Sequence, residues 1–255
     1  MRYEILGRLR VVDDEGATSL TARKMETLLA VLLGRADQVV TTDQLITEIW
    51  GDRPPQRVNA ALHVYISQLR KFLDRPGRRA SPIVTRPQGY LLHLGEDTLD
   101  VNDFQRKVNR GREAAQRGRH EEAVAQFEAA LALWRGRALN DVQDGPILYW
   151  YVTWLEEARL ECVEMLNDAY LMLSRHREVV GRLYVLTGEH PLRESFYRQL
   201  MLALFRSERQ ADALKVYQHA RERLNAELGL EPCRPLRELQ GAILRGDELL
   251  KHTVA

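Results

Sequence analysis

The chain contains 255 residues, of which 45% are hydrophobic and 29% charged, and its formal net charge is +1. This length has room for about two domains with apolar cores. No apolar run approaches the roughly 20 residues that cross a bilayer. Cys162 and Cys233 stand in no Cys-x-x-Cys or Cys/His cluster, so neither a disulfide framework nor a zinc site is indicated. We expect a cytoplasmic protein with no metal or cofactor.

The beginning of the chain predicts a small antiparallel sheet followed by a helix. Residues 3–12 have the pattern of short strands broken at Gly7, and another short strand is expected near residues 19–20, after a turn at residues 13–16. Thr21 is the predicted cap of the helix, and Gly34 ends it. The core positions of this helix keep helical spacing: Met25, Leu28, Leu29, Leu32 and Leu33.

Two further helices follow, joined by a turn. Thr41 and Gln44 predict a capping box ahead of the second helix. Pro54 and Pro55 cannot continue that helix, so the chain turns into a third one over residues 56–74. Two helices joined in this way, the second of them basic, indicate a helix-turn-helix. The buried side of the second helix is predicted to contain Leu45, Ile46, Ile49 and Trp50.

The third predicted helix has an apolar face roughly 140° wide and a polar face opposite it. Many polar helix faces are simply solvated, but the side chains here are mostly of the types that hydrogen-bond base edges and phosphates in a DNA major groove. The apolar face consists of Val58, Ala61, Leu62, Tyr65, Ile66, Leu69, Phe72 and Leu73. The polar face presents Asn59, Ala60, His63, Ser67, Arg70 and Lys71, with Arg57 at the entry.

Basic residues concentrate around this helix. Residues 53–94 contain eight arginines and lysines against the single acid Asp74, whereas the whole chain is nearly neutral. Such a local excess is the electrostatic footprint of a phosphate-binding surface. Arg75, Arg78 and Arg79, just after the helix, contribute to it.

A hairpin is expected next, where the strand-like runs 83–85 and 90–94 flank residues 86–89. Beside the basic helix, this hairpin would be a wing. Arg86 at its tip can reach a phosphate or a narrow minor groove; the alternative is a solvated turn arginine.

From Asp100 onward the pattern is helical throughout. Three segments resemble one another, at residues 118–123, 174–179 and 208–213. The last two are 34 residues apart, the length of a tetratricopeptide helix pair, and the 56-residue gap before them implies an extra helix around residues 146–162. Stacked pairs leave a concave groove that suits peptides or partner domains.

The aromatic residues of this region are interpreted as core and inter-helix packing, with a ligand cage as the alternative. They are Trp134, Tyr149, Trp150, Tyr151 and Trp154. No phosphate loop, nucleophile elbow or His-Glu-x-x-His motif occurs, and the histidines lack metal-ligand spacing. We therefore expect no catalytic residues and no enzymatic activity.

The chain resembles the Streptomyces antibiotic regulatory protein family along nearly its whole length. Residues 45–55, 65–71 and 85–90 are similar to the winged-helix effector domain of OmpR-type response regulators. Later segments resemble the bacterial transcriptional activator domain: residues 130–136, 190–194, 199–204 and 227–232. The resemblance implies a mainly α protein, with an OmpR/PhoB-like winged helix-turn-helix (α+β) at residues 1–98 and an all-α, tetratricopeptide-like activator domain at residues 99–255.

Two departures from the family pattern concern local turns. Glu208 stands where the repeat usually has a glycine, and Cys233 follows Pro232 where glycine is common. Both bear on helix-turn geometry.

The resemblance also implies partners. Members bind direct repeats overlapping the −35 region of a promoter as side-by-side protomers or a dimer, and recruit RNA polymerase through its sigma factor and core subunits. The loop between the second and third helices takes part in that contact. In this chain the corresponding residues are Trp50, Asp52 and Arg53.

We predict a transcriptional activator that binds double-stranded DNA sequence-specifically and associates with the bacterial nucleoid. Its target is expected to be an antibiotic or secondary-metabolite gene cluster. The predicted base contacts are Asn59, His63, Ser67 and Arg70, and the predicted backbone and wing contacts are Arg57, Lys71 and Arg86. Two alternatives remain open: a protein-interaction adaptor in which the winged helix is a docking module, and a DNA-binding repressor.

Overall fold

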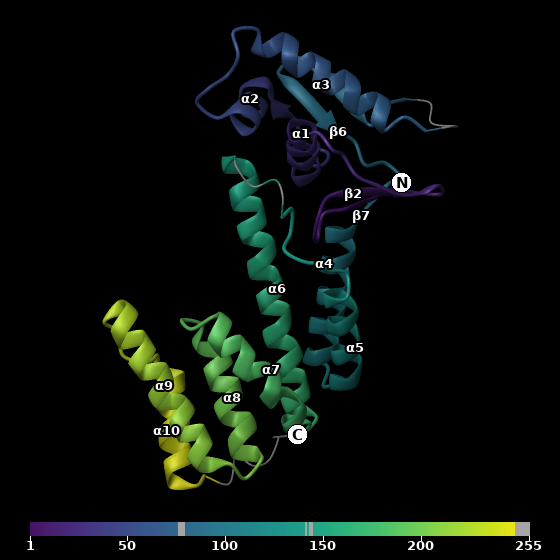
Figure 1. Ribbon diagram of the computed structural model, residues 1–255. Helices are drawn as coiled ribbons and strands as arrows, with labels where there is room; N and C mark the ends of the chain where they lie inside the picture. Colours follow the sequence, from purple (N-terminus) through teal and green to yellow (C-terminus); the bar gives the residue numbers. More distant parts are fainter. Residues whose placement is uncertain (76–79, 141, 143–144, 248–255) are drawn as a thin grey trace. The chain divides into compact units, whose positions relative to one another are not determined.

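The computed structural model describes residues 1–75, 80–140, 142 and 145–247 (Figure 1). Arg78 and Arg79 of the predicted basic stretch lie outside the described residues. Contacts divide the chain into two compact units. One comprises residues 1–106 and 130–160, and the other residues 107–129 and 161–255.

The first unit opens with a four-stranded sheet of order β3-β2-β1-β7, in which only the β1–β7 pair is parallel. A second, three-stranded antiparallel sheet has the order β4-β6-β5. The strands are β1 (Arg2–Glu4), β2 (Arg10–Asp13), β3 (Gly16–Thr18), β4 (Val40–Thr41), β5 (Ile83–Arg86), β6 (Gly89–Leu92) and β7 (Thr98–Leu99).

The first unit also holds the three helices of the helix-turn-helix. They are α1 (Arg23–Gly34), α2 (Thr42–Trp50) and α3 (Val58–Phe72). The predicted winged-helix fold is thereby confirmed, and α1 contributes a continuous buried stretch from Leu28 to Leu33. In Figure 1 these three helices surround strand β6.

Two local predictions in this unit are displaced along the chain. The short strand expected near residues 19–20 is present, but it lies slightly earlier, at Gly16–Thr18, because a tight turn pairs Gly16 directly with Asp13. Thr21 does not cap α1. The first helical acceptor is the carbonyl of Ala22, which receives the amides of Met25 and Glu26, so the cap falls one residue later and has no side-chain hydrogen bond.

The remaining helices form antiparallel pairs, followed by a last helix. They are α4 (Asp100–Gln116), α5 (His120–Leu131), α6 (Pro146–Met172), α7 (His176–Glu189), α8 (Glu194–Arg206), α9 (Gln210–Leu228) and α10 (Arg234–Arg245). The predicted extra helix around residues 146–162 is instead the first half of the single 27-residue helix α6.

The three similar sequence segments fold as the same turn. Gly118, Ser174 and Glu208 all have a positive φ, of 72°, 58° and 64°. In each case the amide of the next residue bonds the carbonyl five positions back, at 2.9 to 3.0 Å, which is a Schellman ending. The repeated segments therefore mark the turn from the first to the second helix of each pair.

Within the second unit, α7 packs on α8, and α8 packs on α9 and α10. Leu183, Phe196, Met201 and Leu204 are fully buried there. A cleft of about 420 Å³ opens among α7, α8 and α9, lined by Tyr184, Leu200, Val216, Lys215 and His219, among others.

Candidate nucleic-acid interface

Helix α2 positions the start of the interface. Its predicted capping box is present: the Gln44 amide donates to Thr41 Oγ1 at 3.2 Å, and the Thr41 amide donates to Gln44 Oε1 at 3.0 Å. The helix stops at Gly51, whose φ of 57° suits glycine. The turn that follows leads into α3.

Helix α3 is anchored by its apolar face as predicted. Leu62, Ile66 and Leu69 are buried, and Tyr65 is half-buried. The Tyr65 ring stacks on Trp50 with centroids 5.8 Å apart, and the Lys24 ammonium lies 5.1 Å from the Trp50 ring. Trp50 is therefore partly occupied in holding the end of α2 against α3.

The opposite face of α3 is open. Asn59, His63 and Ser67, three of the predicted base contacts, are exposed along one side of the helix. Two residues that sequence reasoning left out share this face: Gln68 is exposed, and Val64 is 53% exposed. Their spacing from Ala60 and Lys71 along the helix was the available signal. An exposed valine suits contact with a thymine methyl group.

Arg70 lies apart from these residues because its side chain turns to the wing. Its Nε and Nη2 donate to the Ile83 carbonyl at 3.1 and 3.0 Å, and Nη2 also donates to Thr85 Oγ1 at 2.8 Å. Arg70 therefore clamps α3 to strand β5. Of its three guanidinium nitrogens, only Nη1 makes no hydrogen bond to a described residue, so Nη1 can contact DNA.

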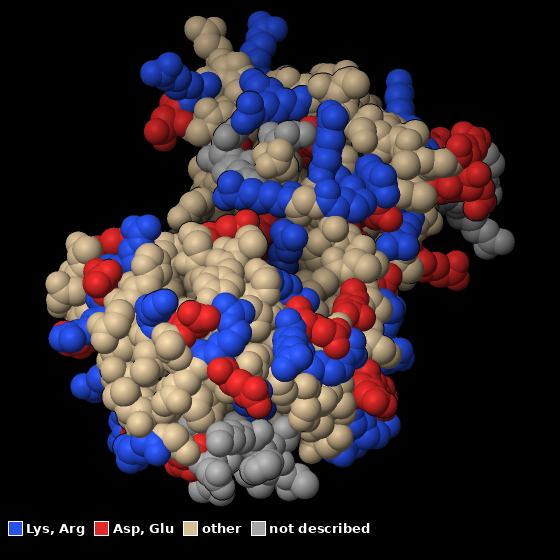
Figure 2. All heavy atoms as spheres, turned by 60° about the horizontal axis from the view of Figure 1, so that its bottom comes forward, with Lys and Arg blue, Asp and Glu red and all other residues tan. Residues whose placement is uncertain are grey.

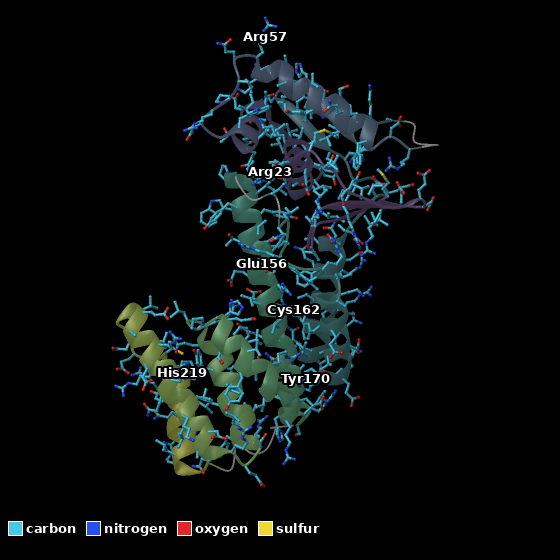
Figure 3. The ribbon with its side chains drawn as sticks, in the orientation of Figure 1. Arg23, Arg57, Glu156, Cys162, Tyr170 and His219 are labelled. Carbon is cyan, nitrogen blue, oxygen red and sulfur yellow. The ribbon has the colours of Figure 1, made fainter. Side chains whose placement is uncertain are left out.

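Four cations of the interface have no acidic partner in the described part of the chain. They are Arg53 and Arg57 before α3, Lys71 on α3, and Arg86 at the wing tip, and all are exposed. Figure 3 shows Arg57 projecting from the start of α3. By contrast, Arg75 pairs with Asp13 and holds the pKa of that carboxyl below its usual range. Unpaired, clustered cations are what a phosphate backbone requires.

The wing is a tight hairpin with Pro87 and Gln88 at its tip. Its position is fixed at two points: the Thr42 amide bonds the Gln88 carbonyl at 3.1 Å, and Gly89 pairs with Thr41. A Cβ at Gly89 would overlap the Val40 carbonyl oxygen. Only glycine allows β6 to approach β4 this closely, and the approach sets Arg86 beside the helix-turn-helix.

The loop between α2 and α3 leaves Asp52 and Arg53 exposed. The Arg53 amide bonds the Trp50 carbonyl at 3.2 Å, which closes the turn. Both side chains are accessible to another protein.

A buried carboxylate on the other side of α2 escaped sequence reasoning. Glu48 is 3% exposed and accepts hydrogen bonds from the amides of Ile147 and Leu148, at the start of α6. Burial raises the pKa of Glu48, and these two amides oppose the rise. Its partners are about a hundred residues away in the sequence, so local periodicity carried no signal for them.

Asp100 plays a comparable part at the first sheet. It is 1% exposed and accepts the amides of Ile5 and Leu6 at 2.9 to 3.0 Å. The Arg135 guanidinium lies 3.7 Å from it. Burial raises the pKa of Asp100. Together, Asp100 and Glu48 tie the winged helix to the segments 135–139 and 146–160 of the same unit.

The described residues hold no group of three or more His, Cys, Asp or Glu side chains arranged to bind a metal ion. Burial raises the pKa of the Cys162 thiol to about 12, which makes it a poor nucleophile at neutral pH. No helix in the described ranges is long and apolar enough to cross a membrane.

Comparison with known proteins places the chain among transcriptional regulators. Residues 99–244 match the bacterial transcriptional activator domain, and residues 15–92 match the C-terminal domain of transcriptional regulatory proteins. The regulatory protein DnrI of Streptomyces peucetius is 37% identical, over 97% of this chain and 93% of DnrI. The transcriptional regulator RedD of Streptomyces coelicolor is 35% identical, over 98% of this chain and 72% of RedD.

A solved structure of Mycobacterium tuberculosis EmbR, in complex with a low-affinity phosphopeptide, matches with a TM-score of 0.90 and 32% identity. The match covers 98% of this chain and 68% of the EmbR chain. A winged helix joined to paired activator helices defines a DNA-binding transcriptional regulator. Within that class, the chain belongs to the Streptomyces antibiotic regulatory protein family.

Proposed function

We propose that this regulator activates an antibiotic or secondary-metabolite gene cluster by binding direct repeats near the −35 element as side-by-side protomers and recruiting RNA polymerase. In this proposal, residues 1–98 bind DNA and residues 99–255 form the activator domain, and the protein acts at the nucleoid without catalysing a reaction. The observation that carries it is that Arg57, Lys71 and Arg86, at the two ends of α3 and at the wing tip, are exposed and have no acidic partner among the described residues.

Base reading is assigned to the open face of α3. Asn59, His63 and Ser67 are exposed there and can enter a major groove, with Val64 and Gln68 beside them. Arg57, Lys71 and Arg86 contact the phosphate backbone. Arg70 keeps its assignment as a base contact through Nη1, and the wing clamp holds its guanidinium in one orientation.

RNA polymerase contact is assigned to the loop after α2. Asp52 and Arg53 are exposed, and the stacking of Trp50 on Tyr65 gives the loop a fixed base. Substituting Asp52 with Ala should leave the DNA shift unchanged and lower transcription from a reconstituted promoter. Loss of DNA binding in the same variant would place Asp52 in the DNA interface instead.

The role of Arg70 is tested by a mobility-shift titration against a promoter site and its single-base-pair variants. If Nη1 pairs with guanine, Arg70→Ala costs about 1 to 3 kcal/mol and relaxes specificity at one base pair. Thr85→Val is the matched control, because it removes one acceptor of the clamp and leaves the outer face of α3 intact. A uniform loss over all sites in Arg70→Ala would limit Arg70 to holding the wing.

The DNA-binding part of the proposal is tested with the unaltered protein at several salt concentrations. With about four to six phosphates neutralised per protomer, log K should fall against log salt with a slope near −4 to −5. Successive protomers on a direct repeat should produce a stepwise shift. A response that is flat in salt would remove the support that the unpaired cations give.

A further inference from the structure

The first turns of α6 expose aromatic rings that were expected in the core. Tyr149, Trp150 and Trp154 are 56%, 68% and 43% exposed, whereas Trp134 is buried. The expectation was wrong for these three because Leu148, Val152 and Leu155 already fill the inward side of the helix. Exposed rings in such a group mark binding surfaces.

A cavity lies beside these rings, within the first unit. Its volume is about 380 Å³, which is the size of a small-molecule site. It opens between the end of α1 and the start of α6. The lining residues are Gly34, Arg35, Pro146, Ile147, Trp150 and Tyr151.

The two aromatic walls of the cavity are each braced by a second ring. Tyr151 stacks on Trp154 with centroids 5.7 Å apart, and Trp150 meets Tyr149 edge to face at 5.2 Å. A Cβ at Gly34 would lie 3.0 Å from the Tyr151 ring, so glycine lets this ring approach the end of α1 closely. The walls are therefore in place before a ligand arrives, which lowers the entropic cost of binding.

Among the described residues that line the cavity, Arg35 is the single charged one. It is exposed, and within the described ranges it has no ion pair. The neighbouring amides of Ile147 and Leu148 are already bonded to Glu48. An anion in the cavity would therefore be held by the guanidinium of Arg35, whose planar fork matches a carboxylate and also stacks on rings.

We propose that this cavity binds a small, flat, conjugated molecule that carries a carboxylate. Its rings lie against Trp150, over a floor formed by Gly34 and Ile147, and its carboxylate pairs with Arg35. The site is separate from the DNA-contacting face of α3, and its occupancy can be measured without DNA.

The test uses the full-length protein and 2-naphthoate as the probe, followed by tryptophan fluorescence and calorimetry. We expect saturable one-to-one binding with a Kd of about 10 μM to 1 mM, as is usual for a ligand of this size. The neutral analogue 2-naphthamide should bind at least about tenfold more weakly, because it lacks the charge-assisted pair.

Variants locate the site. Arg35→Gln should lower the affinity for 2-naphthoate by about tenfold or more and leave the affinity for 2-naphthamide nearly unchanged. Trp150→Ala should abolish binding. Trp150→Phe keeps an aromatic ring, so it should retain most of the calorimetric heat of binding but lose most of the ligand-induced quenching of tryptophan fluorescence. Arg221→Gln, at an exposed position of α9 where the arginine pairs with Glu231, is the control and should bind like the parent protein.

Three results would overturn the proposal. They are the absence of saturable binding at millimolar probe, equal affinity for 2-naphthoate and 2-naphthamide, and unchanged affinity in Arg35→Gln. The comparison of the two probes needs no substitution, so it stays decisive even where a variant unfolds.

Discussion

The exposed cations of the winged helix and those of the helical pairs in the second unit differ in whether they have acidic partners. Arg57, Lys71 and Arg86 have no acidic partner among the described residues. In the second unit, many cations form ion pairs with acids, and Figure 2 shows Lys and Arg interspersed with Asp and Glu over the lower part of the view. Examples are Arg175 with Glu178, Arg209 with Asp212 and Arg221 with Glu231, at 2.7 to 2.9 Å.

This difference separates two purposes of surface charge. Exposed ion pairs contribute little to stability, and they present no net field to a ligand. Clustered cations without partners create a positive potential, which attracts a polyanion from a distance. The net charge of the whole chain is +1 and hides the distinction, which becomes visible only when partners are assigned residue by residue.

The largest effect is expected from a substitution that disrupts the wing. Gly89→Ala drives a Cβ into the Val40 carbonyl, so β4 and β6 must separate. We expect a loss of about 3 kcal/mol or more in unfolding free energy, with loss of the DNA shift. Chemical denaturation and a mobility-shift assay measure the two.

Gly188→Ala in α7 is the control for that experiment. A Cβ at Gly188 meets open space, and the residue is in a helix, so stability should rise by about 0.5 to 1 kcal/mol with DNA binding unchanged. Equal stability of the Gly89 and Gly188 variants would contradict the close approach at the wing.

The next effect concerns the buried carboxylate of α2. Glu48→Ala leaves the amides of Ile147 and Leu148 without their acceptor, and we expect a loss of about 2 kcal/mol in unfolding free energy. Glu178→Ala removes an exposed acid of the helical pairs and should leave the unfolding free energy almost unchanged. Denaturant titrations of both variants measure the two changes in unfolding free energy, and so compare a buried acid with an ion-paired acid on the surface.

Glu48 also makes stability depend on pH. Its pKa is raised in the folded protein, so folding favours the protonated form. The stability that this group contributes is therefore present below its ordinary pKa and is lost as pH rises through the raised value. The Glu48→Gln variant should show a flatter decline over that interval. An identical pH profile in the variant and the parent would count against this assignment.

A smaller effect tests the cations directly. Lys71→Gln should weaken binding by a similar factor on every DNA sequence and reduce the salt slope by about one. Arg175→Gln is the matched variant in the helical pairs, where Glu178 already neutralises the charge, and should leave the slope unchanged. Equal slopes for the two variants would erase the distinction between paired and unpaired cations.

The smallest effect belongs to the helical pairs. Glu208 has a φ of 64°. This left-handed conformation is unfavourable for any residue with a Cβ atom and costs glycine very little free energy. Glu208→Gly should therefore stabilise the protein by about 0.5 to 1 kcal/mol, allowing for the greater freedom of the unfolded chain. Gly118→Ala should shift the melting temperature in the opposite direction.

Local patterns predicted well wherever the deciding contacts lie within a few residues. The Thr41–Gln44 capping box, the two faces of α3 and the repeated turns are of this kind, since helical spacing and cap chemistry act over one or two turns. Placement of the Thr21 cap failed by a single residue, which is the usual uncertainty of helix ends.

Long-range partners could not be predicted. Nothing around Arg70 indicates that its guanidinium bonds Ile83 and Thr85, and the link from Glu48 to α6 spans about a hundred residues. The rings at the start of α6 were misplaced because their aromatic type suggests burial, whereas the direction of each side chain depends on which helix face is already filled. The base contacts remain predictions for the same reason: they depend on a partner outside the chain.

The bond from Glu48 to the start of α6 has a practical consequence for dissecting the protein. A fragment that stops at residue 98 keeps Glu48 and loses the two amides that satisfy it, along with Asp100, which holds the amides of Ile5 and Leu6. Such a piece exposes a former interior to water. A fragment meant to contain the whole winged-helix unit would also have to include residues 130–160, since they belong to the same compact unit.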